Sequence, residues 1–189
     1  MDKIRSTAQA ALLAAAIAIS GSALAAEPLA RSIGEPQPPV SAALRSAAAD
    51  GDARAQYQLA VALACGRGAR ANPAEAARWF EKAARQGHLQ SKSVLGWMAM
   101  TGRGVPRDDA RALALLTEAA EAGSASAQNN LGVMYARGQG VPVDEAKAEK
   151  WFDEAARQGA LDAARNRDEL RKGNRKTARP TQDLPDFRT

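Results

Sequence analysis

The chain of 189 residues carries 26 basic and 21 acidic side chains, but only one histidine and one cysteine. Apolar residues make up 46 % of it and aromatic residues 4 %, a composition that favours one domain of packed helices over a β-sandwich or barrel. A single His and a single Cys exclude a zinc finger, a Cys/His metal cluster and a framework of internal disulfides. We therefore expect an all-α protein that holds no metal and needs no cofactor.

The first 25 residues have the pattern of a secretory signal peptide. Lys3 and Arg5 give a basic start, residues 10–19 are an apolar stretch, and residues 23–25 (Ala-Leu-Ala) form a small-x-small cleavage pattern. Because a membrane-spanning helix takes about 20 residues, we favour cleavage near Ala26 over an uncleaved anchor. A cleaved signal predicts a periplasmic or secreted bacterial protein.

Two segments flank the central part of the chain. Residues 26–39 hold four prolines and are expected to be an extended linker, and residues 172–189 are expected to be a disordered basic tail. Residues 1–25 carry a net charge of +1 and residues 171–189 one of +4, so the total of +5 leaves residues 26–170 balanced. The tail is either a solvated terminus or a weak electrostatic contact to an anionic envelope surface. No nucleic-acid partner is expected, because the basic residues do not alternate with aromatic ones.

The central part repeats itself with a period of 36 residues. The units are residues 53–88, 89–124 and 125–160. Periods of 20 to 50 residues are typical of solenoids, in which each unit buries its apolar face against its neighbours. The glycines that recur at this spacing include Gly51, Gly87, Gly123 and Gly159.

Each unit is expected to form two helices. The first helices are predicted over residues 53–65, 89–101 and 125–137, where a Gly-x-Gly loop ends each of them. The second helices are predicted to begin at residues that cap exposed amides and to end at the recurring glycines. In the first unit Pro73 and Glu75 also fit a first helical turn with a capping box. The expected capping residues are Asn72, Asp108 and Asp144.

Half-units complete the predicted stack. Residues 40–52 match a second helix of an earlier unit, and residues 161–171 match a first helix. The latter helix is strongly charged, as suits the outer face of a capping helix. With the three full units these make eight helices in residues 40–171.

The units resemble Sel1-like repeats, which are relatives of tetratricopeptide repeats. The third unit fits the family pattern best, and the matching residues are Ala127, Leu131, Gly132, Tyr135, Gly138, Gly140, Val141, Asp144, Ala148, Trp151, Phe152, Ala155, Ala156 and Gly159. The first unit departs from it at Ala60 and Ala69, and the second at Ala99 and at the Leu115-Leu116 pair. The resemblance implies an α-solenoid of antiparallel helix pairs that acts as a scaffold or adaptor. It also implies roles in signalling, exopolysaccharide or envelope regulation, or host interaction.

The faces of the first helices follow from the advance of about 100° per residue. In residues 53–65 the apolar arc that recurs between units is expected to pack against neighbouring helices. The opposite arc varies between units and, in similar tetratricopeptide folds, lines the concave surface. We expect this arc to bind a protein or peptide partner. The candidate residues are Arg54, Tyr57, Val61, Gln90, Ser93, Trp97, Met100, Asn129, Val133 and Arg137.

Trp97 is the sharpest of these candidates. The other units have valine at its position, so the repeat itself does not require a tryptophan. An accessible Trp97 beside Met100 would be a hot spot for a partner. The alternative is that Trp97 fills space left by Ala99. Asn129 and Arg137 could fix polar groups of the same partner.

Other conspicuous residues have structural explanations. His88 follows a C-capping glycine and is expected to be structural rather than catalytic. Cys65 is either a thiol at the edge of the core or the site of an intermolecular disulfide or redox sensor. The acidic pairs that begin the second helices are explained by capping better than by acid–base catalysis. The Trp-Phe pairs at residues 79–80 and 151–152 keep the period and are expected in the core.

The sequence thus predicts a non-enzymatic, monomeric scaffold or adaptor of the bacterial envelope, with no catalytic residues. A structural spacer tethered through the basic tail is the main alternative. An enzyme acting on envelope glycans is less favoured, because no nucleophile–base pair or phosphate-binding loop is present.

Overall fold

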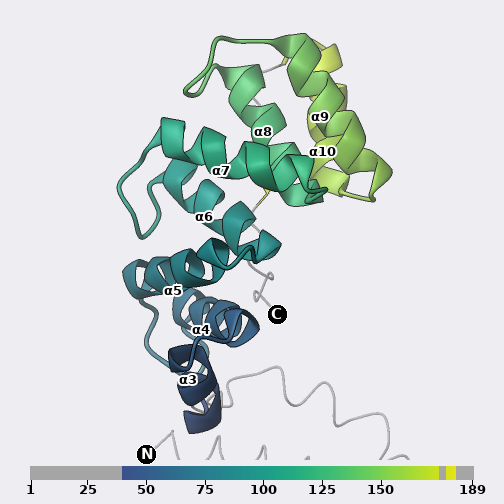
Figure 1. Cartoon of the computed structure of the whole chain (residues 1–189). Helices are drawn as coiled ribbons and strands as arrows, with labels where there is room; N and C mark the ends of the chain where they lie inside the picture. Colours follow the sequence, from purple (N-terminus) through teal and green to yellow (C-terminus); the bar gives the residue numbers. More distant parts are fainter. Residues whose placement is uncertain (1–39, 175–177, 182–189) are drawn as a thin grey trace, which may run out of the picture. The chain divides into compact units, whose positions relative to one another are not determined.

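The structure, a computed structural model, describes residues 40–174 and 178–181, which belong to one compact unit. Within these residues it contains eight α-helices and no strand, which confirms the predicted all-α solenoid (Figure 1). The signal peptide and the proline-rich linker lie outside the described residues, so both stay predictions. No helix in the described part of the chain is long and apolar enough to cross a membrane.

The helices follow the 36-residue period, and each packs against the next along the chain. The predicted spans of all three first helices and of the capping helix agree with the structure, while the half-unit forms a shorter helix than expected. The helices are α3 (Ala42–Ala49), α4 (Ala53–Cys65), α5 (Pro73–Arg85), α6 (Leu89–Thr101), α7 (Asp109–Glu121), α8 (Ala125–Arg137), α9 (Glu145–Arg157) and α10 (Leu161–Arg171).

Side-chain caps begin the second helices α5, α7 and α9, as predicted. The side chains of Asn72, Asp108 and Asp144 each accept a hydrogen bond from the amide three residues on, at 2.9 to 3.1 Å. Such caps are worth about 1 kcal/mol each, because they satisfy amides that have no partner inside the helix. The capping box differs from the expected form. Glu75 accepts from the side-chain amide of Asn72 (3.1 Å), while the backbone amide of Asn72 donates to the carbonyl of Leu63.

The Gly-x-Gly loops both end the first helices and join neighbouring units. Gly102 ends α6 with φ +72°, a left-handed conformation that favours glycine. Two residues on, Gly104 lies so close to α5 that a Cβ there would be 2.5 Å from the carbonyl oxygen of Pro73. Gly140 approaches Asp109 of α7 in the same way, at 2.9 Å. The second glycine of each of these two loops is therefore a contact between units as well as a turn residue.

Glycines inside the first helices allow close approach within a unit. A Cβ on Gly132 of α8 would lie 2.6 Å from the ring of Phe152 in α9, and one on Gly96 of α6 would lie 2.7 Å from Leu116 in α7. Phe152 is fully buried, whereas Trp151 next to it is half-buried.

The Trp-Phe pair of the first unit divides in the same way. Phe80 is fully buried, but Trp79 is half-buried, with the ammonium of Lys82 3.9 Å from the centroid of its ring. The core prediction therefore holds for the two phenylalanines, while the two tryptophans are only partly buried and pack against the edge of the core. The reason is helical geometry, since adjacent residues point about 100° apart and only one of them can face the core.

Buried glutamines connect the units. In the first and third units a glutamine of the first helix donates to a carbonyl near the end of the preceding helix, and a second glutamine after the second helix donates to the first. The bonds are Gln56 to Ala48 O (3.1 Å), Gln128 to Ala120 O (3.2 Å), Gln86 to Gln56 (2.9 Å) and Gln158 to Gln128 (2.7 Å). In the middle unit Lys92 stands at this position and forms an ion pair with Glu118 instead.

The last helix, α10, docks on α9 through three ion pairs, the longest of which joins Arg171 to Asp153 at 3.8 Å. Arg167 lies 3.1 Å from Asp153, and Arg171 lies 2.5 Å from Glu149. On the adjoining side of α10, Ala163, Asn166 and Leu170 are buried, while Arg165 and Asp168 are exposed. A charged outer side with a buried inner one fits the predicted capping helix.

Candidate partner-binding site

The ten candidate residues lie on the first helices of the three units, and we call the surface made by α4, α6, α8 and α10 on this side the first-helix face. Three of the candidates are exposed, namely Arg54, Gln90 and Arg137, and two are half-buried, namely Tyr57 and Val61. The other five are buried, which are Ser93, Trp97, Met100, Asn129 and Val133. The arc predicted to pack between helices, from Ala55 to Leu63 in α4, is buried as expected.

Trp97 is not the accessible hot spot that the sequence suggested. It is only 6 % exposed and belongs to the same apolar cluster as Met100, with the guanidinium of Arg103 5.7 Å from the centroid of its ring. A side chain so covered offers a partner little surface. The structure thus favours the alternative, in which Trp97 fills space in the core. A role of Trp97 in binding stays a prediction that no contact tests.

His88 and Tyr57 form an aromatic contact at the start of α6. Their ring centroids are 4.8 Å apart, and the ring of Phe80 lies 5.8 Å from that of Tyr57. His88 is the N-cap of α6, where its Nδ1 accepts from the amide of Ser91 (3.3 Å). Burial lowers the pKa of His88, which favours the neutral ring that this cap requires. These contacts support the structural role predicted for His88.

Three buried asparagines dominate the end of the first-helix face. Asn129 and Asn130 of α8 are 0 % exposed and Asn166 of α10 is 2 % exposed. The side chain of Asn166 donates to that of Asn129 (2.8 Å), so the two amides are linked. Burying a side-chain amide costs free energy unless the amide is hydrogen-bonded. The other hydrogen-bond partners of these three side chains therefore indicate what this face can bind.

Their partners come from the chain's own C-terminal part, residues 178–181, which we call the tail segment. Asn166 donates to the carbonyl of Arg179 (2.6 Å) and accepts from its amide (2.8 Å). Asn130 donates to the carbonyl of Thr181 (3.0 Å) and accepts from its amide (2.6 Å). Two side-chain amides thus each hold both main-chain groups of one residue of the tail segment.

The remaining contacts of the tail segment come from candidates that the sequence did predict. Asn129 donates to the carbonyl of Arg179 (3.1 Å) and to the hydroxyl of Thr181 (2.8 Å). Arg137 donates to the carbonyl of Ala178. Desolvation lowers the pKa of Arg137 from its ordinary value, but an arginine stays charged in proteins, so this bond is charge-assisted.

Ala178 anchors the tail segment in an apolar cluster at this end of the molecule. It is 1 % exposed and belongs to the cluster that contains Val133, Ala136, Ala163 and Leu170. The expectation of a disordered tail is therefore wrong for these four residues. The physical reason is that Ala178 is buried among apolar side chains and that polar side chains of α8 and α10 bond the main chain of the tail segment. The composition around these residues is nevertheless that of a solvated terminus.

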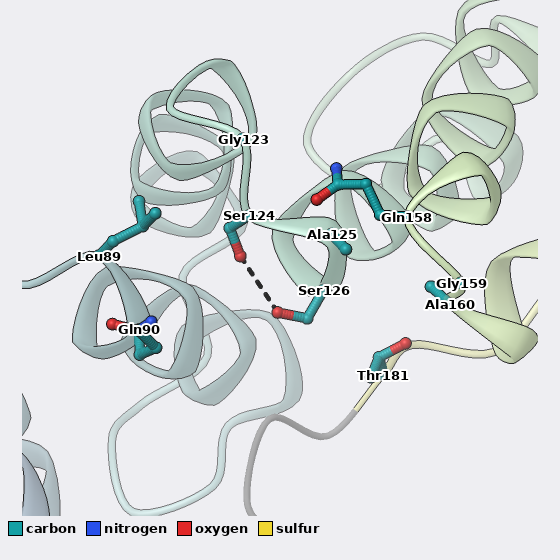
Figure 2. Close-up of a pocket in the computed structure, with 10 residues that line it drawn as sticks. All are labelled: Leu89, Gln90, Gly123, Ser124, Ala125, Ser126, Gln158, Gly159, Ala160 and Thr181. Carbon is teal, nitrogen blue, oxygen red and sulfur yellow. Dashed lines mark hydrogen bonds between the residues drawn. The ribbon is translucent and has the colours of Figure 1, made fainter.

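An open pocket continues from the tail segment toward the middle unit. It is lined by residues from the starts of α6, α8 and α10, and Thr181 lies at its edge (Figure 2). Its polar lining includes Gln90, one of the candidates, and the hydroxyls of Ser124 and Ser126, which lie 3.2 Å apart. The hydroxyl of Ser124 also lies 2.7 Å from that of Ser93, so this buried candidate is joined to the pocket through Ser124.

Groups that could suggest catalysis have other partners in the described residues. Asp109 accepts two hydrogen bonds from Arg107 at 2.9 Å, beside the helix cap made by Asp108. No three His, Cys, Asp or Glu side chains in the described ranges are grouped so as to hold a metal ion. Cys65 is half-buried, and burial raises the pKa of its thiol above the usual value, which disfavours the reactive thiolate.

The fold and this face define the chain as an all-α repeat protein built of stacked helix pairs. The family model of the Sel1 repeat matches residues 53–88, 93–124 and 125–159, which is more than half of the chain. The chain belongs to the Sel1 repeat family. Sel1 repeat proteins are generally protein-interaction scaffolds, typically non-enzymatic, that bind protein partners.

Two solved structures are similar to this chain. One is a protective antigen present in uropathogenic Escherichia coli strains and displaying an SLR fold, with 38 % identity and a TM-score of 0.64 over 74 % of this chain. The match covers 29 % of that antigen, so this chain spans less than a third of its length. The other is a Sel1 repeat protein from Oxalobacter formigenes, with 37 % identity and a TM-score of 0.59 over 67 % of this chain and 96 % of that one. Among curated proteins, none is significantly similar.

Proposed function

We propose that the protein is a non-enzymatic scaffold of the bacterial envelope that holds a partner protein or peptide on its first-helix face. Membership of the Sel1 repeat family supports a scaffold. The signal-like pattern of the first 25 residues supports export to the periplasm or the medium. A role in signalling, exopolysaccharide regulation or host interaction would follow from the identity of the partner.

One observation carries the proposed binding role. The amides of Asn129, Asn130 and Asn166 are buried and arranged to bond the main chain of an extended segment. Asparagine at a buried position contributes little to packing and needs hydrogen-bond partners. A face that gathers three buried asparagines therefore depends on polar groups from outside its own helices. The first-helix face is thus chemically suited to hold polypeptide.

The non-enzymatic part of the proposal is supported by what the polar residues do. His88, Asp108 and Asp144 serve as helix caps, so each has a structural reason to be where it is. An enzyme would need a general acid or base free to meet a substrate.

The experiment is quantitative capture of partners from an envelope extract by the full chain and by two variants. In Asn130→Asp the carboxylate keeps the shape of the side chain but cannot donate to a main-chain carbonyl. Arg85→Ala, on the exposed side of α5, is the matched control. A partner enriched by the full chain should be lost from Asn130→Asp and retained by Arg85→Ala, and circular dichroism should show that both variants keep their helices.

Two results would contradict this proposal. Equal capture by all three proteins would favour a spacer tethered through its basic tail. Turnover of an envelope glycan by the purified chain would favour the enzyme, and the scaffold would then be wrong.

A further inference from the structure

We propose that α8 and α10 form a site for four consecutive residues of an extended peptide. The first residue is small, the second is any residue but proline, the third can be proline, and the fourth is Thr or Ser. The chain's own tail segment occupies this site, and a partner segment of the same chemistry must displace it. This inference deepens the proposed function, since it names the kind of partner and what regulates its access.

The geometry selects an extended main chain. Asn166 pairs with both main-chain groups of Arg179, and Asn130 pairs with both of Thr181, two residues further on. In an extended chain alternate residues present their main-chain groups on the same side, which matches this spacing of two. Both positions must supply an amide hydrogen, so proline is excluded at each of them.

The side chains of the tail segment set the remaining preferences. Ala178 is enclosed in the apolar cluster, so a large or charged residue does not fit there. The side chain of Arg179 is exposed, and within the described ranges its guanidinium has no hydrogen-bond or ion-pair partner. Pro180 stands at the position where no amide hydrogen is used. The hydroxyl of Thr181 accepts from Asn129, and serine carries the same group.

Burial explains why this site is kept filled. If the tail segment leaves, the three asparagine amides lose the main-chain and hydroxyl partners that they have in this structure. The tail segment follows α10 after only six residues, so its effective concentration at the site is on the order of millimolar. A partner segment therefore competes against a resident one.

The test measures binding of a fluorescent peptide, residues 175–184 of this sequence, to the full chain by anisotropy. Thr181→Pro and, separately, Ala178→Asp are made in the full chain to release its own tail segment. Arg179→Ala is the matched control, because only the main chain of Arg179 is used. Circular dichroism checks that all variants keep their helices.

We expect weak binding to the full chain and to Arg179→Ala, and binding about ten- to a hundred-fold tighter to the two released variants, as removal of a tethered competitor predicts. The same substitutions are also tested in the peptide. A peptide with the Arg179→Ala change should bind the Thr181→Pro chain as the parent peptide does, whereas one with the Thr181→Pro change should lose binding at least ten-fold.

Three results would overturn the inference. No peptide binding to correctly folded released variants would mean that no peptide site exists. Equal, measurable binding to the full and released chains would mean that the tail segment does not occupy the site. A full chain that is dimeric and becomes monomeric on Thr181→Pro would assign the tail segment to a second copy. None of these concerns capture of an envelope partner, so failure here and failure of the proposed function can be told apart.

Discussion

At the scale of single residues, polar side chains decide the character of the first-helix face. Helical angles placed Asn129 and Arg137 on the partner-binding arc, and both contact the tail segment. Asn130 was missed because it lies just beyond that arc. Asn166 was missed because its helix was interpreted only as a charged cap. Asn166 stands one repeat period after Asn130, and this recurrence was the signal in the sequence that could have identified both residues.

Trp97→Ala should destabilise the fold, because Trp97 is buried in the main apolar cluster. Loss of a buried aromatic side chain costs about 3 to 5 kcal/mol through lost burial and the cavity that remains. Urea unfolding monitored by circular dichroism measures this cost. Trp79→Ala, at a half-buried position, is the control and should cost less. An unchanged unfolding free energy for Trp97→Ala, with partner binding lost, would restore Trp97 as an accessible hot spot.

His88 should make stability fall as the pH is lowered from about 7.5 to 5.5. Burial lowers its pKa in the folded protein, so the unfolded chain, with an ordinary pKa of about 6.5, binds the proton first and is favoured in acid. Protonation also removes the lone pair that accepts from Ser91. Melting temperatures across this range measure the effect.

His88→Asn is the matched variant for this pH dependence, since asparagine caps helices without titrating. It should flatten the decline. Asp144 and Glu169 also have lowered pKa values, through their hydrogen bonds, but they titrate at more acidic pH. A decline as steep in His88→Asn as in the parent chain would show that His88 is not its cause.

At the scale of elements, the sequence was informative wherever glycines and caps mark helix ends. These signals act locally, so the bounds of the first helices and of the capping helix could be predicted. The glutamine bonds between units could not, because the middle unit has Lys92 and Ala122 at the corresponding positions and the pattern recurs only every second unit. Long-range side-chain partners of this kind appear only once the helices are placed.

Gly132→Ala should loosen the packing of α8 against α9. The added methyl group would lie 2.6 Å from the ring of Phe152, so the helices or the ring must shift. Overpacking of this kind typically costs about 1 to 3 kcal/mol. Thermal unfolding measures it, and Phe152→Leu in the same chain should recover part of the loss. A melting temperature equal to that of the parent chain would show that the ring moves without cost.

At the scale of the whole molecule, the repeat period predicted the helix order, the motif residues of the units predicted the family, and helical angles predicted the face that meets the tail segment. It could not predict that this face is covered from within the chain. Four residues of mixed composition carry no periodic signal, and their place depends on side chains about 50 residues earlier.

Export of the chain stays a prediction, and it belongs to this scale. When the full sequence is expressed in a Gram-negative bacterium, the protein recovered from the periplasm or medium should have the intact mass of a chain that begins near Ala26. The basic start and the Ala-Leu-Ala pattern before that residue are the reason. Lys3→Glu combined with Arg5→Glu should slow processing. A full-length mass confined to the cytoplasm would contradict export.

The close approach of Gly104 to Pro73 and of Gly140 to Asp109 has a consequence for how such a protein can grow. The middle unit brings both halves of this seam, a bare backbone at its loop and a receiving surface at its second helix. A duplicated unit of 36 residues would therefore find a matching second helix before it and a matching loop after it. The array could then gain or lose units by recombination without a new interface.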